Sequence, residues 1–367
     1  MKRKEKSMEK DVYRELLEVM KSRGGSYAGA DIPEFFAMAK ALFTPEEAAV
    51  NNAMPKESVT ADQMAQIMGR DAEWVRQTLE EMANKGLCIA LDMDGTVIYK
   101  SARFMVGILE FQFLPGRVTE RDKRNARLIH AYKMAFNKLQ PVDQSPKVSS
   151  IRVITVDKTV HPRDVIHTYD QVQTYIDEND LIAVGTCYCR HAALLRGEDI
   201  HGMPNDTCMQ FGPSAKFSIE RLGARKVTKQ EAREVLDRSE EAGLIHMSQN
   251  IAEGIGFICN CDRWHCTAVT QAVKAHKPSL FMDSGFQPQF DPDACVACET
   301  CVGRCPSEAI SMGDEDLPHV DIDRCFGCAV CASGCPSEAI AMIHKPDFKM
   351  PPLNAKELNK AMKASTP

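Results

Sequence analysis

Eight cysteines near the end of the chain fall into two runs with the same spacing. Each run has the form C-x2-C-x2-C-x3-C-P, and the second begins thirty residues after the first. The first run is Cys295, Cys298, Cys301 and Cys305, and the second is Cys325, Cys328, Cys331 and Cys335. Thiolates at such intervals let one tight loop hold three corners of a [4Fe–4S] cube, while the fourth cysteine starts a new turn. The chemistry that this spacing predicts is one-electron transfer.

Zinc and disulfides fit this spacing less well. Zinc sites separate two C-x2-C pairs by a long spacer, whereas each run here lies within eleven residues and is followed by Pro-Ser-Glu-Ala-Ile. Disulfides need an oxidising compartment, and the charged start Met1-Lys-Arg-Lys-Glu-Lys, with no apolar stretch after it, predicts no signal peptide. We therefore expect two [4Fe–4S] clusters in a cytoplasmic protein. A degenerate copy without metal is the alternative.

Residues 288–345 resemble the bacterial two-cluster ferredoxin family. In that arrangement the fourth cysteine of each run ligates the cluster of the other run. The resemblance therefore implies two crossed ligand sets. One is Cys295, Cys298, Cys301 and Cys335, and the other is Cys325, Cys328, Cys331 and Cys305.

A second group of cysteines lies in the middle of the chain. It consists of Cys187, Cys189, Cys208, Cys259, Cys261 and Cys266. Two C-x-C pairs stand at predicted strand-to-loop junctions, and thiolates this dense in a reduced protein normally coordinate a soft metal. The leading interpretation is a third iron–sulfur cluster on four or more of the six. A structural zinc site, redox-active dithiols and simple core cysteines are the alternatives.

Four other side chains in this region are candidates for a role at the metal. His265 is the best non-cysteine ligand, and His191 ranks similarly, both below the cysteines. His246 is more typical of a hydrogen-bonded core histidine. Arg190 could neutralise the charge of a cluster or donate to its sulfurs, with a surface salt bridge as the equal alternative.

The middle segment also resembles a group of iron–sulfur proteins from anaerobes. The matching segments are Cys187-Tyr-Cys189-Arg190, Cys208, Gly243-Leu-Ile-His246 with Asn250, and Ile258-Cys-Asn-Cys261. The resemblance spans residues 150–345 and implies an electron-transfer partner of a larger oxidoreductase. Relatives are often richer in cysteine after the last segment, where this chain has Asp262, Trp264 and His265, which argues against an expanded cluster.

Residues 35–103 carry signals for helix, turn, helix and hairpin in that order. Asp71 can cap a helix over 72–85, and Asp-Gly in the turn at 92–95 is a hairpin signal. This order resembles the winged-helix domain. Its second helix is acidic, which is costly beside DNA phosphates. We therefore favour protein docking or dimerisation over DNA binding.

Length and composition predict a globular multidomain protein, and the order of the expected helices and strands predicts the α+β class. The chain has 367 residues, a net charge of −6 and 44% hydrophobic residues, and no stretch of eighteen apolar residues. Within 104–150 we expect an apolar strand up to Leu114, a basic helix over 120–139 and a linker from Pro141. The predicted domains are a helix at 1–34, a winged-helix-like domain at 35–103, the connector and linker at 104–150, a cysteine-rich α/β domain at 151–284, a 2[4Fe–4S] ferredoxin-like domain at 285–345 and a tail at 346–367.

The function predicted from these features is an electron-transfer protein or subunit. It would relay single electrons between a partner oxidoreductase and other carriers. There is no G-x-G-x-x-G after a strand and no Walker sequence, so we expect no nucleotide cofactor bound by these motifs. Two alternatives are an enzyme with an open middle cluster and a redox-sensing winged-helix regulator. We expect a redox protein partner, no nucleic acid and no membrane span; winged helices often pair, which suggests a homodimer.

Overall fold

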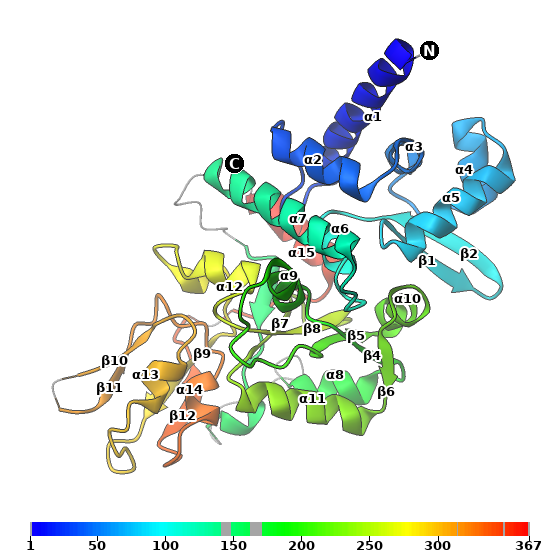
Figure 1. Cartoon of the computed structure of the whole chain (residues 1–367). Coiled ribbons are helices and arrows are strands. Elements are labelled where there is room, and N and C mark those ends of the chain that lie inside the picture. Colours follow the sequence, from blue (N-terminus) through cyan, green and yellow to red (C-terminus); the bar gives the residue numbers. More distant parts are fainter. Residues whose placement is uncertain (1, 141–147, 162–170, 314, 348, 366–367) are drawn as a thin grey trace. The chain divides into compact units, whose positions relative to one another are not determined.

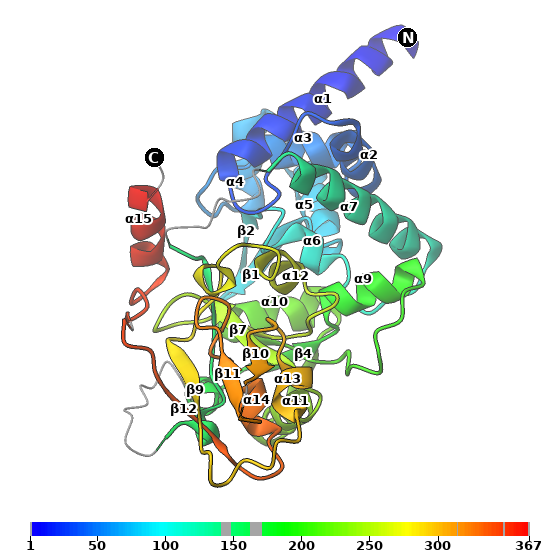
Figure 2. The same cartoon turned by 90° about the vertical axis from the view of Figure 1, so that its left-hand side faces the viewer.

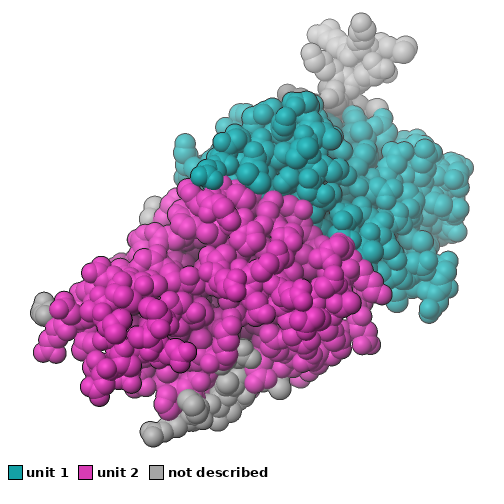
Figure 3. All heavy atoms as spheres, turned by 60° about the horizontal axis from the view of Figure 1, so that its bottom comes forward, with its two compact units in different colours: residues 1–141, 191–199, 216–224 teal, residues 142–190, 200–215, 225–367 magenta. Residues whose placement is uncertain are grey.

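The computed structural model describes residues 2–140, 148–161, 171–313, 315–347 and 349–365. The chain divides into two compact units, coloured separately in Figure 3. Unit 1 comprises residues 1–141, 191–199 and 216–224, and unit 2 comprises residues 142–190, 200–215 and 225–367. Part of the predicted linker, residues 141–147, lies outside the described residues. In the described ranges no helix is long and apolar enough to cross a membrane.

Unit 1 is mostly helical, with one β-hairpin (Figure 1). Its helices are α1 (Lys2–Arg23), α2 (Pro33–Leu42), α3 (Pro45–Ala53), α4 (Ala61–Met68), α5 (Ala72–Asn84), α6 (Ile108–Phe111) and α7 (Glu120–Lys138), and its hairpin is β1 (Cys88–Met93) with β2 (Thr96–Ser101). The side chain of Asp71 accepts the Trp74 N–H, which confirms the predicted cap of α5. The predicted strand before Leu114 is wrong, because α6 lies there. Its first turn is closed by Glu110, whose carboxylate accepts the Gly107 N–H at 2.8 Å.

The second helix of the predicted winged-helix module is held by other residues of unit 1. Arg221 lies near the end of α10 (Gly212–Leu222), and its guanidinium bonds Glu80 at 2.5 Å and Asn84 at 3.1 Å. The Tyr99 hydroxyl also donates to Glu80. The acidic side chain of α5 at position 80 is therefore neutralised inside the unit.

Unit 2 is built on a six-stranded sheet of order β3-β7-β8-β5-β4-β6, in which every pairing is antiparallel. The strands are β3 (Ile151–Val153), β4 (Ile182–Gly185), β5 (Cys208–Phe211), β6 (Arg225–Val227), β7 (Ile245–Gln249) and β8 (Phe257–Cys261). The helices of this region are α8 (Val172–Glu178), α11 (Lys229–Glu241) and α12 (Thr267–Ala272), with short 3-10 turns at Asp157–Thr159 and Pro278–Leu280. Helix α9 (Tyr188–Arg196) begins in unit 2, and its residues from His191 on belong to unit 1. Apolar side chains of α8 and α11 pack with those of β4 and β5 in one core. Figure 2 labels α11, β4 and β7 of this region from a second side.

The rest of unit 2 contains the two cysteine runs as a structural repeat. Its elements are β9 (Phe286–Phe290), α13 (Thr300–Arg304), β10 (Ile310–Met312), β11 (Pro318–Val320), α14 (Val330–Ser333), β12 (Ile340–His344) and α15 (Ala355–Ser365). Strand β9 pairs with β12, and β10 pairs with β11. Positive φ angles recur thirty residues apart, at Ala297 and Gly327, Glu299 and Ala329, and Glu308 and Glu338. The duplication seen in the sequence is therefore also a duplication of backbone conformation.

Gly327 is a position of the repeat where the backbone leaves no room for a side chain. Its φ is +69°, and a Cβ there would overlap the Ser284 Oγ and the Phe286 carbonyl oxygen. We expect Gly327→Ala to destabilise the protein by at least about 2 kcal/mol, since left-handed strain adds to the overlap. Gly303→Ala is the matched control, because no atom lies within 4 Å of the added Cβ. Denaturant midpoints followed by circular dichroism test this, and equal midpoints for the two variants would contradict it.

Candidate metal centres

A cavity brings three cysteines of the first run together with the last cysteine of the second. It is lined by Cys295, Cys298, Cys301 and Cys335, with Pro336 and Ile340 among its other walls. Burial raises the pKa of the Cys301 thiol, and the neighbouring Cys298 and Cys335 add to this rise. The structure thus groups Cys335 with the run to which it does not belong in sequence.

The remaining four cysteines of the two runs form a second group. Burial raises the pKa of Cys325 to about 11, and the charge of Cys305 adds to it. The same two causes raise the pKa values of Cys328 and Cys331. Cys305 therefore lies with the second run.

Backbone groups around these thiols suit an anionic cluster. The Ala309 N–H points at the Cys305 sulfur at 3.2 Å, and the Gly327 N–H at the Cys325 sulfur at 3.4 Å. The buried Lys345 ammonium donates to the Cys325 carbonyl at 2.8 Å. Such donors stabilise negative charge on ligating sulfur. The donor set fits a [4Fe–4S] group, which exchanges one electron at a time when bound.

The sheet of unit 2 brings the middle cysteines to one edge. Strand β5 runs antiparallel to both of its neighbours, so the end of β4, the start of β5 and the end of β8 lie at the same end of the sheet. Gly185 of β4 pairs with Cys208 of β5. Cys187 follows β4 by two residues, and Cys259 and Cys261 end β8. Residues distant in sequence therefore meet through strand pairing.

The six middle thiols lie close enough to influence one another's pKa values. The Cys259 thiol is within hydrogen-bonding reach of Cys208 and Cys261, and the Cys266 thiol of Cys189 and Cys261. Burial raises the pKa of Cys187 to about 11; Arg190 lowers it, and the charges of Cys259 and Cys266 raise it. All six predicted ligands are brought together.

Two helix N-termini face this group. Helix α9 begins directly after Cys187, whose sulfur accepts the Arg190 N–H. Cys266 is the N-cap residue of α12. Helix N-termini carry partial positive charge, which opposes the effect of burial on the pKa of a thiol.

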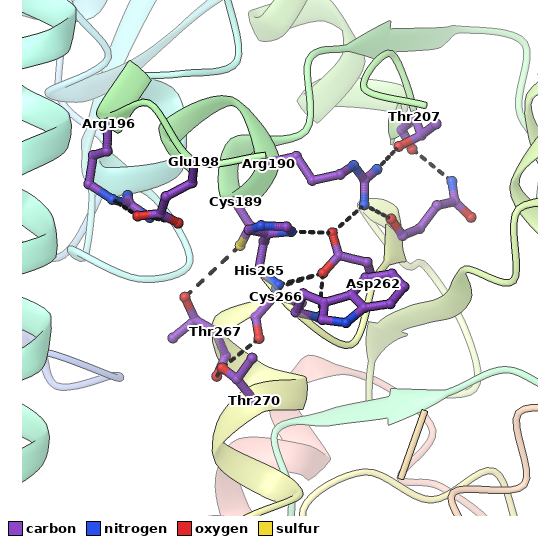
Figure 4. A network of polar contacts seen from close by, with 12 residues as sticks. Cys189, Arg190, Arg196, Glu198, Thr207, Asp262, His265, Cys266, Thr267 and Thr270 are labelled. Atoms are coloured by element: carbon purple, nitrogen blue, oxygen red, sulfur yellow. Dashed lines mark hydrogen bonds and ion pairs between the residues drawn. The ribbon is translucent and has the colours of Figure 1, made fainter. Parts of the chain in front are cut away.

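Arg190 is a buried cation whose charge interacts with Cys187, and Figure 4 shows its guanidinium bonded to Thr207 and Asp262. Its side chain is 1% exposed, which excludes the surface salt bridge considered from sequence. The guanidinium donates to the Asn260 carbonyl at 3.0 Å and the Thr207 hydroxyl at 2.6 Å, and lies 3.4 Å from the Asp262 carboxylate. The negative charges of Cys187 and Asp262 oppose the effect of burial, so the pKa of Arg190 is raised.

Asp262 is a site residue that sequence reasoning did not single out. Its carboxylate accepts the backbone N–H groups of Trp264 at 2.8 Å and His265 at 2.5 Å, and it folds the loop that carries Cys266 (Figure 4). Burial raises its pKa, but the His265 N–H and the Arg190 charge outweigh burial and hold the pKa below its usual value. The tendency of aspartate to cap its own following turn was the available signal.

The three histidine candidates lie in different settings. The Nδ1 of His265 contacts Asp262 at 3.2 Å, which leaves Nε2 as the nitrogen that could bind a metal. His246 is buried, with Nδ1 at 2.6 Å from Asn260 and Nε2 at 3.4 Å from Glu240, so it is a core histidine as predicted. His191 belongs to unit 1, where its Nε2 lies 2.8 Å from the Arg117 carbonyl.

A single metal ion finds no ready site. Over the described ranges, no three His, Cys, Asp or Glu side chains have the arrangement that could hold one ion. The eight cysteines of the two repeated runs, which the structure describes, also lack a site for a single ion, so this result does not distinguish the middle cysteines from them. Cubane ligands are spread over four irons rather than gathered on one.

A comparison with known protein families identifies the segment that contains the two repeated runs. Residues 288–342 match the family model described as the 4Fe-4S dicluster domain. No curated protein matches the chain, and no solved structure does. This segment is therefore a ferredoxin-type domain, and it confirms that part of the predicted fold. The chain is accordingly an iron–sulfur protein with a general electron-transfer role and at least one [4Fe–4S] cluster.

Proposed function

We propose that the chain relays single electrons between a partner oxidoreductase and other carriers, through two [4Fe–4S] clusters and a third metal centre. One observation carries the proposal. Cys261 and Cys266 of the middle group and Cys328 of the dicluster domain belong to the same hydrophobic core. Adjacent redox groups packed without intervening solvent are what a relay requires.

The ligand sets that we propose for the two clusters are crossed. One set is Cys295, Cys298, Cys301 and Cys335, and the other is Cys325, Cys328, Cys331 and Cys305. The cavity that Cys335 shares with the first run supports this pairing. The contribution of Cys305 to the raised pKa of Cys331 supports it as well.

For the middle centre we favour an iron–sulfur cluster over zinc. A buried guanidinium and two helix N-termini suit a group that carries net negative charge. The ligands are drawn from Cys187, Cys189, Cys208, Cys259, Cys261 and Cys266. The resemblance of this segment to iron–sulfur proteins of anaerobes points the same way.

A reductive titration tests the relay. Anaerobic protein titrated with dithionite and followed by electron paramagnetic resonance should take up about three electrons per chain, one for each centre. It should then turn over only when coupled to a redox partner. Uptake of two electrons would remove the middle centre from the relay, and uptake of none would refute the proposed function.

A redox-sensing DNA regulator is less well supported. If the hairpin and α5 are a winged helix, the Glu80 of its second helix is already bound by Arg221 and Tyr99, and the helix surface remains acidic. We expect no measurable affinity for a random-sequence duplex by fluorescence anisotropy at low salt, where phosphate contacts are strongest. Salt-dependent binding would favour the regulator.

A second candidate function is an iron–sulfur enzyme with substrate bound at the middle centre. The contact of His265 with Asp262 favours it, because an oriented imidazole is a ligand that a substrate could displace. Added imidazole or cyanide should then change the resonance signal of the middle centre in the wild type and leave that of His265→Cys unchanged. An unchanged signal in both would dismiss this candidate.

A further inference from the structure

The two repeats of the dicluster domain expose equivalent loops very differently. We call residues 295–299 the outer loop and residues 325–329 the inner loop; they occupy matching positions thirty residues apart. In the outer loop Val296 is 65% exposed, and Cys298 and Glu299 are also exposed. Every residue of the inner loop is buried, and Phe326 is 1% exposed. One repeat therefore faces solvent and the other faces protein.

The inner loop is covered by the part of unit 2 that holds the middle cysteines. Phe326 and Cys328 pack in one core with Cys261 and Cys266. The Gly327 carbonyl accepts the Ser284 hydroxyl at 2.8 Å. The inner cysteines are therefore the ones that adjoin the middle thiols.

A polar contact joins the same two groups. Arg263, one residue after Asp262, donates to the Cys305 carbonyl at 3.2 Å. Cys305 lies with the inner cysteines rather than with its own run. The shared apolar core and the Arg263 hydrogen bond therefore both connect the region of the middle thiols with Cys305, Cys325, Cys328 and Cys331, which we call the inner centre.

Charge divides the domain in the same way. Residues 286–323 contain nine Asp and Glu residues and a single Arg or Lys, Arg304, whereas residues 324–345 contain only one acid, Glu338, with Arg324 and Lys345. The Arg304 guanidinium makes hydrogen bonds inside unit 2, to the Glu240 carbonyl at 2.9 Å and the Val330 carbonyl at 3.1 Å. The solvent-facing repeat is thus also the acidic one.

We propose that the outer loop, with its neighbour Asp293, is the docking surface for a cationic redox protein. The inference rests on the proposed relay and gives it an order. The centre of Cys295, Cys298, Cys301 and Cys335 exchanges electrons with the external partner, and the inner centre connects it to the middle thiols. An acidic surface around the exposed centre attracts basic partners and repels acidic ones.

Two small oxidants of opposite charge test the docking surface. Reduced holoprotein is mixed with hexaamminecobalt(III), a cation, or with the anionic cobalt(III)–EDTA complex; each cobalt(III) takes one electron from a reduced cluster and becomes cobalt(II). We expect the cation to react faster, and Asp293→Asn/Glu299→Gln to slow it about 3–10-fold while not slowing the anion. Asp237→Asn on exposed α11 is the control and should change neither rate. An equal effect of the control, or no effect of the double variant, would overturn the proposal.

Hydrogen–deuterium exchange of the oxidised holoprotein gives a readout that needs no electron transfer. Amides of the outer loop should exchange at least about tenfold faster than those of the inner loop. Cytochrome c, used as a cationic probe, should protect the outer loop, and the double variant should lose this protection. Equal exchange in the two loops, or protection elsewhere, would overturn the docking surface. Failure of the electron titration would instead overturn the proposed function.

Discussion

Replacing Cys305 with serine is expected to remove the cluster of the other run, with a loss of about four irons per chain. Cys305 stands four residues after Cys301 in sequence, yet its charge acts on Cys325, Cys328 and Cys331. When one thiolate of this buried site is lost, the other three cysteines cannot hold a complete cluster. After alkylation under anaerobic conditions, mass spectrometry should find label on Cys325, Cys328 and Cys331 in the variant.

The remaining cysteines provide the internal comparison for this experiment. Cys295, Cys298, Cys301 and Cys335 should stay protected in Cys305→Ser, since they belong to the other ligand set. Cys88→Ser is the control, because Cys88 is buried in unit 1, with its thiol 3.7 Å from the Leu79 carbonyl, and should retain all iron. Label on Cys295, Cys298 and Cys301 in place of the second run would show that ligation is not crossed.

Replacing Arg190 with methionine should be the most damaging change outside the cysteines. The guanidinium and the Asp262 carboxylate are each 1% exposed, so the variant leaves a buried carboxylate without its cation. Such a loss costs roughly 3–5 kcal/mol of stability. The middle centre should be lost as well, because the charge beside Cys187 and the anchor of the Asp262 loop both disappear. Urea unfolding followed by circular dichroism, with metal analysis, measures both effects.

Two further arginine variants make this result interpretable. Arg238→Met removes an exposed pair with Asp206, 47% and 59% exposed, and should cost about 0–1 kcal/mol. Arg190→Lys retains the charge but lacks the planar fork that contacts Asn260, Thr207 and Asp262 together, so an intermediate loss is expected. If Arg190→Met were as stable as Arg238→Met and retained its metal, the buried cation would have no role in holding the site.

Local signals in the sequence predicted much of the fold. The cap of α5 at Asp71 is formed as expected. The hairpin turn before Gly95 also formed. The spacing of the cysteine runs located the dicluster domain, which the family match confirms. All of these depend on contacts between residues close in sequence.

Long-range contacts could not be obtained in this way. The order of the six strands brings Cys187, Cys208 and Cys259 to one edge, and no local pattern specifies that order. The burial of Arg190 depends on Thr207 and Asn260, which come from separate parts of the chain. Even the local error at α6 has this origin, because a short apolar run fits a strand or a buried helix equally well.

Iron, acid-labile sulfide and zinc per chain, measured on anaerobically purified protein, test the central claim most directly. The three-centre relay predicts about twelve irons, about twelve sulfides and no zinc. About eight irons with roughly one zinc would contradict it. The six middle cysteines would then be a structural site beside a two-cluster ferredoxin domain.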